Sequence, residues 1–316
     1  MKLAPLVVAA STLSLGLFAF AQAKTEAPAE TAAPAEASAP AEADAPAEAA
    51  TSVTVEEAKA DPANWRAVDP ERLFIFDTNK GRILIEAFPE VAPKHYAQFS
   101  AIIRSGDFDG TTFHRVINGF MAQGGDIFAL KGRESGLPDI PGEFTYRRDP
   151  AKLPLNFAIG PADTAKYGYV NGFPMMTQAS FFSEMSKDGL VESWIPHCRG
   201  VVSTARTSDP DSANSQFFLM RDTSQHLDKQ YTAWGRVVQG EDVVLAIKAG
   251  KESLNGEVAL PDILMSAKVA ADLPKGERPN VWVERTDGPI FMAANADVDE
   301  DMNVCDLPSV PAVVER

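Results

Sequence analysis

The chain has 316 residues, which is enough for two domains or for one enlarged domain. Hydrophobic residues make up 45% of it, enough for a sizeable core, and the formal net charge is −15 at pH 7. Because an acidic surface repels phosphate groups, this charge argues against a nucleic-acid partner.

Residues 1–23 have the pattern of a secretory signal peptide. Lys2 gives a positive start, Leu3–Phe20 is almost wholly apolar, and Ala21-Gln22-Ala23 is a small-residue cleavage site. The alternative is an uncleaved membrane anchor, but the apolar run is at the short end for a bilayer span and no positive cluster follows it. We therefore predict cleavage after Ala23, export to the periplasm, and no stable membrane insertion afterwards.

Residues 24–52 consist mainly of alanine, proline and glutamate and repeat motifs such as Ala-Pro-Ala-Glu. They include no aromatic or large aliphatic side chain, so they cannot bury enough apolar surface to offset the entropy of ordering. This composition predicts a disordered linker.

The folded part is predicted to begin near Val53 with a β-hairpin. Leu73–Thr78 and Arg82–Phe88 are rich in β-forming residues and flank the turn signal Asn79-Lys80-Gly81. Pro93–Ser105 then has apolar residues at helical spacing and is followed by a glycine, which predicts a helix.

The next patterns predict an all-β core. Further strands are expected at Thr111–Val116, Phe120–Gln123, Gly200–Ala205, Gln216–Met220 and Ala233–Val238, and a second helix at about 240–248. Many strands with only two helices indicate an all-β barrel or sandwich with helical caps.

Two stretches are less regular. The long segment between Asp126 and Cys198 contains many prolines, but its aromatic-rich part, Tyr167–Phe182, favours an ordered structure. Residues beyond Lys275 are acidic and weakly patterned, apart from a possible short strand at 281–283.

The two cysteines, Cys198 and Cys305, allow two interpretations. In an exported protein they can form a disulfide, but they can also be two unrelated residues. Together with four widely spaced histidines they show no metal-ligand pattern, so we expect neither a metal nor another cofactor.

Two segments carry the residues of chemical interest, 113–126 and 214–219. If they lie side by side, Phe120, Met121 and Phe218 can line an apolar pocket. Arg115, Gln123 and Gln216 can then place polar groups at its edge. The sequence shows no pairing of a nucleophile with a base and no phosphate-binding loop.

Such a pocket suits proline, because the ring is apolar and rigid. The barrier to rotation about the preceding amide is about 18–20 kcal/mol, since twisting destroys the amide resonance. A cationic donor aimed at the nitrogen binds the twisted state better than the planar one, and Arg115 is suited to that role.

The two segments resemble the signature of the cyclophilin family of peptidyl-prolyl cis-trans isomerases, in a bacterial exported form. The first reads Phe-His-Arg-Val-Ile-Asn-Gly-Phe-Met-Ala-Gln-Gly-Gly-Asp and the second Asn-Ser-Gln-Phe-Phe. The resemblance implies an eight-stranded antiparallel β-barrel capped by two helices, over about residues 53–275. It also implies a long insertion at about 127–197 and an acidic C-terminal extension at 276–316.

The resemblance implies a role for each site residue. Arg115 would be the catalytic arginine, and Tyr231 would close the proline pocket. The other implied substrate-binding residues are Phe120, Met121, Phe218 and Leu227 in the pocket, Gln123 and Gln216 along the substrate backbone, and Ala205 and Arg206 at the floor or edge. The alternative is that the aromatic residues belong to the core, as we expect for Phe217, and that Arg115 is a surface ion-pair partner.

The chain departs from the family pattern at several positions. His226 stands where the best-known eukaryotic members have a tryptophan that is important for cyclosporin, which predicts weak cyclosporin binding. Tyr231 replaces a histidine, and Arg206 replaces an asparagine and adds charge beside the groove. Glu143-Phe144 is expected to retain part of a family strand, whereas about Thr145–Ile195 is the insertion.

Two functions remain open at this point. The first is an isomerase that acts on proline-containing polypeptides and assists the folding of exported proteins. The second is a non-catalytic module of the cell envelope that binds proline segments. Arg115 favours the first, because a pure binder needs no donor at the twisted nitrogen.

Overall fold

The computed structural model describes residues 53–159, 164–299 and 301–315. The predicted signal peptide and linker lie outside these described residues. Within the described ranges, no helix has both the length and the apolar character needed to cross a membrane.

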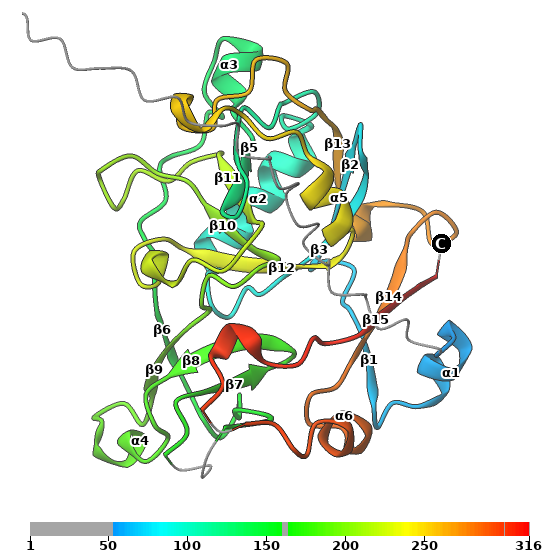
Figure 1. Cartoon of the computed structure of the whole chain (residues 1–316), viewed down its shortest axis with the longest axis vertical. Coiled ribbons are helices and arrows are strands. Elements are labelled where there is room, and N and C mark those ends of the chain that lie inside the picture. The colour runs from blue at the N-terminus through cyan, green and yellow to red at the C-terminus, as the bar shows by residue number, and fades with distance from the viewer. Residues whose placement is uncertain (1–52, 160–163, 300, 316) are drawn as a thin grey trace, which may run out of the picture. The chain divides into compact units, whose positions relative to one another are not determined.

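The largest sheet is antiparallel, has eight strands and curls into a barrel (Figure 1). Its strands in sheet order are β13 (Leu264–Val269), β2 (Leu73–Thr78), β3 (Gly81–Ala87), β12 (Ala233–Gln239), β10 (Val201–Thr204), β11 (Phe217–Met220), β5 (Met121–Gly124) and β4 (Arg115–Ile117). Two isolated bridges, Thr112 with Ile263 and Arg115 with Glu257, link the region of β4 to the segment that leads into β13. The predicted eight-stranded barrel is confirmed.

The hairpin β2–β3 has the predicted register, with Thr78 opposite Gly81. Gly81 has a φ of +140°, and a Cβ there would lie 2.8 Å from a methyl group of Val243, so glycine is required for both reasons. Strand β13 was not predicted from the sequence.

Two helices cap the barrel as expected: α2 (Pro93–Ser105) and α5 (Glu241–Ala246), which is shorter than predicted. The residue before α2 provides no side-chain cap. Glu143 supplies it instead, because its carboxylate accepts the backbone N–H groups of Lys94 and His95 at 3.1 Å and contacts His95 Nδ1 at 2.7 Å. The expected strand at Glu143-Phe144 is therefore wrong, since this segment runs out of the sheet to cap a helix.

The barrel interior is apolar and rich in aromatic rings. Phe99 stacks on Trp234 with ring centroids 4.7 Å apart, and Phe217 contacts Phe76 at 5.2 Å and Phe108 at 5.5 Å. All five side chains are fully buried. Phe217 is thus a core residue, as the alternation along β11 predicts.

The segment predicted to be an insertion, about residues 127–197, contains a second, four-stranded antiparallel sheet. Its order is β6 (Tyr146–Arg148), β9 (Val191–Trp194), β8 (Phe173–Thr177) and β7 (Tyr167–Val170), and the same segment carries α3 (Ile127–Lys131) and α4 (Phe182–Met185).

Arg148 lies buried within this second sheet, 2% exposed. Its guanidinium donates to the hydroxyl groups of Ser193 and Thr177 and to the carbonyl of Leu153. Burial lowers the pKa of Arg148, because the charged form loses its hydration.

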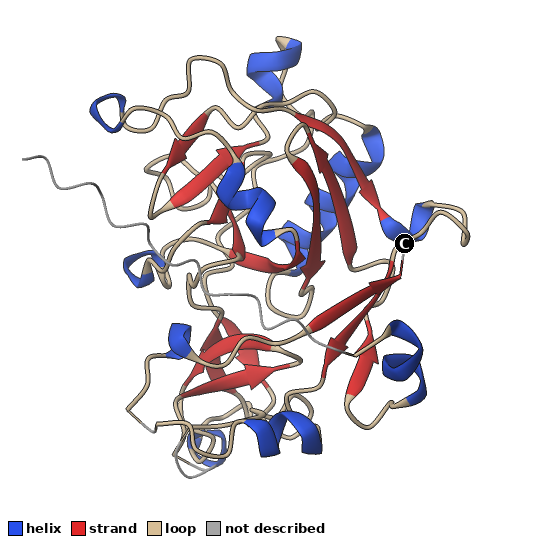
Figure 2. Ribbon diagram, turned by 45° about the vertical axis from the view of Figure 1, so that its right-hand side comes forward, coloured by secondary structure: helices blue, strands red, loops and turns tan. Residues whose placement is uncertain are grey.

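The C-terminal residues complete a third sheet together with the beginning of the folded part. Its strands are β1 (Trp65–Ala67), β14 (Asn280–Glu284) and β15 (Ala312–Glu315), in that order, so the strand expected at 281–283 is confirmed. The remaining short elements are α1 (Val55–Ala60), α6 (Pro289–Ala294), η1 (Gln225–Leu227), η2 (Glu252–Leu254), η3 (Ala270–Asp272) and η4 (Val304–Asp306). Figure 2 shows the two smaller sheets on the same side of the barrel.

A second apolar core joins these parts to the outside of the barrel. Phe88, which follows β3, packs against Phe173 of the insertion with ring centroids 4.7 Å apart. The same cluster includes Phe218 from the barrel, Met175 from the insertion and Phe291 from the C-terminal part. The insertion therefore backs one side of the barrel and does not project away from it.

A buried ionic network lies at the same junction. Glu86 of β3 accepts two bonds from Arg66 of β1, at 2.6 and 2.9 Å, and one from Arg236 of β12 at 3.2 Å. Arg66 also donates to the carbonyl of Asn171 in the insertion. Burial tends to raise the pKa of Glu86, but the two guanidinium groups hold it below its ordinary value.

Candidate active site

A groove of about 340 Å³ opens on the outside of the barrel. Its walls come from β4, β5, the end of β10, β11 and the segment that contains η1. The lining residues are Arg115, Phe120, Met121, Gln123, Ala205, Arg206, Phe218, His226, Leu227, Gln230 and Tyr231. Every site residue that was predicted from the sequence, except Gln216, therefore lies in the lining of this one groove.

Arg115 is held at the edge of this groove by neutral partners. Its Nε donates to the carbonyl of Asn255 and its Nη2 to the side-chain oxygen of Asn255, both at 3.0 Å. Its Nη1 donates to Oε1 of Gln123 at 3.3 Å. These bonds fix the guanidinium without neutralising its charge, and they leave some of its N–H groups for a ligand.

Gln216 lies behind Gln123 and orients it. Its amide nitrogen donates to the carboxylate of Asp126 at 3.1 Å, and a carboxylate only accepts. The oxygen of Gln216 must therefore face Gln123, whose amide nitrogen donates to it at 2.8 Å. This order turns the oxygen of Gln123 towards Arg115, so Gln216 acts on the groove through its neighbour.

The apolar end of the groove is formed by Met121, Phe218 and Leu227, which are all buried. Phe120 is half-buried beside them and stacks on His226 with ring centroids 6.0 Å apart. Tyr231 packs edge-on against Phe218 at 5.9 Å. A rigid apolar ring fits such a wall.

Arg206 lies at the rim of the groove and contacts two other residues of its lining, Gln230 and Tyr231. Its Nε and Nη2 donate to the carbonyl of Gln230, at 3.0 and 2.8 Å, and its Nη1 donates to the carbonyl of Thr207. The guanidinium carbon lies 4.4 Å from the centroid of the Tyr231 ring, which is a cation–π distance. Ala205 precedes it and adds only a methyl group to the floor.

Three residues in or beside the groove were not assigned to the site from the sequence. His226 was noted only as a departure from the family, and Gln230 carries no recognisable signal. Asn255 reaches Arg115 across 140 positions of sequence. The Asn255-Gly256 pair, with a φ of 53° at Asn255, is a turn signal that could have drawn attention to this loop.

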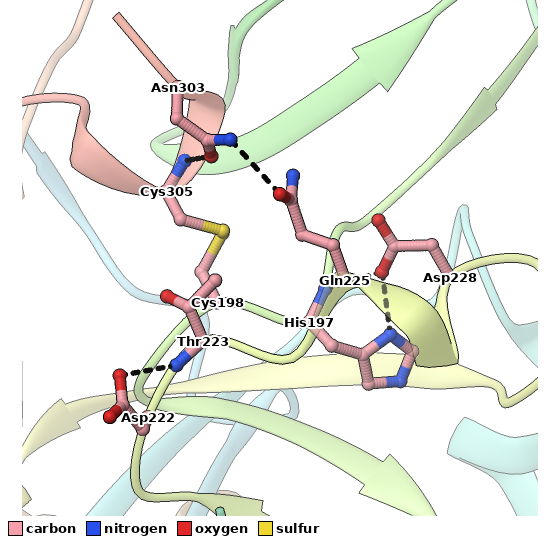
Figure 3. The surroundings of a disulfide bond; sticks show 8 residues. All are labelled: His197, Cys198, Asp222, Thr223, Gln225, Asp228, Asn303 and Cys305. Carbon is pink, nitrogen blue, oxygen red and sulfur yellow. Dashed lines mark hydrogen bonds and ion pairs between the residues drawn. A yellow bond between two sulfur atoms is a disulfide. The ribbon is translucent and has the colours of Figure 1, made fainter. Parts of the chain in front are cut away.

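The groove wall is supported from behind by His197. Its ring stacks on Phe218 at 6.1 Å, and its Nδ1 and backbone nitrogen contact the carboxylate of Asp228, next to η1, at 2.9 and 2.8 Å. Figure 3 shows that the next residue, Cys198, forms a disulfide with Cys305 of η4. Of the two interpretations of the cysteines, the structure therefore supports the disulfide.

Asn303 adds a second tie between η4 and η1. Its amide nitrogen donates to the side chain of Gln225 at 3.0 Å, and its oxygen accepts from the backbone of Cys305 (Figure 3). The C-terminal part thus stabilises the segment that carries His226 and Leu227. Within the described part of the chain, no group of three or more histidine, cysteine, aspartate or glutamate residues could hold a metal ion.

Comparisons with known proteins agree with this geometry. Residues 73–269 match the family described as cyclophilin type peptidyl-prolyl cis-trans isomerase/CLD. A probable peptidyl-prolyl cis-trans isomerase of Brucella abortus is 36% identical over 206 residues, which are 65% of this chain and 86% of that protein. A peptidyl-prolyl cis-trans isomerase of Streptomyces antibioticus is 31% identical, with 61% of this chain and 95% of that one covered.

A solved structure is similar over a larger share of the chain. The crystal structure of a cyclophilin from Hirschia baltica is 48% identical and has a TM-score of 0.78. The match covers 83% of this chain and 97% of that one, so it extends beyond the residues of the family match. The chain therefore belongs to the cyclophilin-type peptidyl-prolyl cis-trans isomerases, the enzymes that rotate the peptide bond before proline.

Proposed function

We propose that the groove is the active site and that Arg115 is its catalytic residue. A proline ring would lie against Met121, Phe218 and Leu227, with Phe120 and Tyr231 at its sides. Gln123 would hold the substrate backbone and Arg206 would border it.

The chemistry requires neither an acid nor a covalent intermediate. As the amide twists, its nitrogen becomes pyramidal and gains a lone pair that can accept a hydrogen bond. A guanidinium N–H directed at this nitrogen stabilises the twisted state more than the planar one, and this lowers the barrier. Because Asn255 and Gln123 already fix Arg115, little reorganisation is needed during rotation.

The observation that carries this proposal is the fixed, un-neutralised guanidinium at the mouth of an apolar pocket. It also favours catalysis over the alternative of a non-catalytic proline-binding module. Binding alone would need the apolar wall but not a donor held at its edge.

The test compares the wild-type chain with Arg115→Ala on a short Ala-Pro peptide, with cis-to-trans conversion followed by NMR. We expect kcat/KM to fall about 10²- to 10³-fold, as is typical when one transition-state donor is removed. Arg147→Ala is the matched control, because this arginine forms an exposed ion pair with Asp188 in the insertion. A folded wild-type chain without activity, or a fully active Arg115→Ala variant, would contradict the proposal.

We also place the enzyme in the periplasm, where it would assist the folding of exported proteins. The signal-like pattern of residues 1–23 supports this location, and so does the disulfide between Cys198 and Cys305, because disulfides persist in oxidising compartments. Sequencing the N-terminus of the protein from a periplasmic fraction should give Lys24 first. A chain that begins at Met1 would support the membrane-anchored alternative.

Cyclosporin should bind weakly, because His226 takes the place of a tryptophan and is engaged with Phe120 and Ser224. Inhibition of the isomerase by cyclosporin measures this directly. Nanomolar inhibition would contradict the prediction, and His226→Trp should strengthen inhibition.

A further inference from the structure

The groove is cationic although the protein is acidic. Its lining includes Arg115 and Arg206 and contains no aspartate or glutamate, whereas the whole chain has a net charge of −15. Charges of one sign in a concave, partly apolar site attract ligands of the opposite sign.

Neither arginine of the groove is neutralised by an acid in the described part of the chain. The acceptors of Arg206 are backbone carbonyls, and those of Arg115 are the oxygens of Asn255 and Gln123. Glu257 pairs with Arg115 through the backbone, and no ion pair joins their side chains.

Lys229 shows the contrast on the same segment of chain. Its ammonium group forms an ion pair with Glu192 at 3.0 Å and lies over the ring of Trp194, outside the groove lining. The ammonium group of Lys229 beside the groove is thus neutralised, whereas the guanidinium groups of Arg115 and Arg206 inside it can still pair with an anionic group of a ligand.

We propose that the groove prefers proline segments that carry a carboxylate within about two residues of the proline, and that Arg206 recognises this charge. The inference rests on the proposed function, because the segment must occupy the groove. Arg206 is suited to the task, since its bonds to Gln230 and Thr207 and its contact with Tyr231 hold the guanidinium in place before a ligand arrives. A pre-organised donor loses little conformational entropy on binding.

The chain itself supplies a sequence of this class for the test. Ala-Pro-Ala-Glu occurs four times between residues 27 and 48, at intervals of six residues. Each copy places a glutamate two residues after a proline, so a blocked peptide built on this motif is a suitable probe.

The experiment measures kcat/KM of the full chain on Ala-Ala-Pro-Ala-Glu-Ala and on its glutamine counterpart, both with blocked ends, by NMR exchange. We expect the glutamate peptide to be preferred about two- to fivefold at low salt, the range of a solvent-accessible ion pair. The preference should fall towards one as salt screens the charges.

Variants assign the preference to a residue. Arg206→Gln should bring the glutamate-to-glutamine ratio close to one, whatever its effect on the absolute rate, and Arg206→Lys should keep most of the ratio. Arg147→Gln makes the same change in net charge at an ion pair in the insertion, so it should leave the ratio unchanged.

Two results would overturn the inference: equal kcat/KM for the two peptides when both are accelerated, or a preference that survives Arg206→Gln. Acceleration of neither peptide would be a different failure, because it would contradict the isomerase site itself as well as its preference.

Discussion

The barrel and the parts attached to it are held together by different kinds of contact. Inside the barrel, Phe76, Phe99, Phe217 and Trp234 pack against one another without any charged group among them. The attached parts share one apolar cluster with the outside of the barrel, but they also depend on a disulfide and on the buried Glu86 network. The barrel is therefore stabilised mainly by apolar packing, whereas the junction combines apolar packing with a covalent cross-link and an ionic network.

The sharpest test of this difference uses two neighbouring residues of β11. Phe217 points into the barrel core and Phe218 into the groove wall, so Phe217→Ala should cost about 3–5 kcal/mol of unfolding free energy, the usual range for a buried phenylalanine. Phe218→Ala should cost less stability and should mainly lower kcat/KM. Urea unfolding followed by tryptophan fluorescence, with the peptide assay alongside, measures both; equal stability losses would remove the distinction.

The disulfide tests the junction directly. Cys198 and Cys305 are 107 residues apart, and removing a cross-link of this span typically costs about 2–4 kcal/mol. We therefore expect the double variant Cys198→Ser/Cys305→Ser to unfold at lower urea concentration than the oxidised wild-type chain. A reductant should move the wild-type curve onto that of the variant and leave the variant unchanged, because the chain has no other cysteine. An unchanged midpoint would show that the apolar cluster and the Glu86 network hold the junction without the disulfide.

Acid should weaken the same junction through Glu86. Because its pKa in the folded protein lies below the ordinary value of 4.5, its contribution to stability is present above that value and is lost as the pH falls through the lowered one. Glu86→Gln should cost about 1.5–3 kcal/mol near neutral pH, as expected for a bond to a charged group. The difference in unfolding free energy between the wild-type chain and Glu86→Gln should become smaller as the pH is lowered below 4.5, the ordinary pKa of glutamate. A difference that does not change with pH would contradict the role of ionised Glu86 at the junction.

The same division explains how far the sequence could predict the molecule. The barrel strands and α2 were predictable because alternation, helical spacing and the Asn79-Lys80-Gly81 turn are local signals. Strand β13 was missed because the polar residues Ser266 and Lys268 interrupt its apolar pattern. The strands of the insertion have only three to five residues each, too few to show a period, and their pairing crosses long connections.

Buried polar residues were harder still to predict. Nothing local marks Arg148 as a fully buried arginine, since arginines are usually exposed. In the groove, Arg115, Gln123 and Phe218 came together because the two short motifs form the neighbouring strands β4, β5 and β11. Asn255 and Gln230 come from elsewhere in the chain and act through contacts that only the folded structure creates.

The shared use of β11 has a practical consequence for protein engineering. Successive residues of this strand face two different cores, so the barrel and the insertion have one wall in common. A shortened enzyme made by cutting out residues 145–195 would uncover Phe88, because its partner Phe173 would be lost, and exposed apolar surface of that kind promotes aggregation. A minimal version of this catalyst would therefore need a redesigned outer face, with polar substitutions at Phe88 and its neighbours, before its loops could be trimmed.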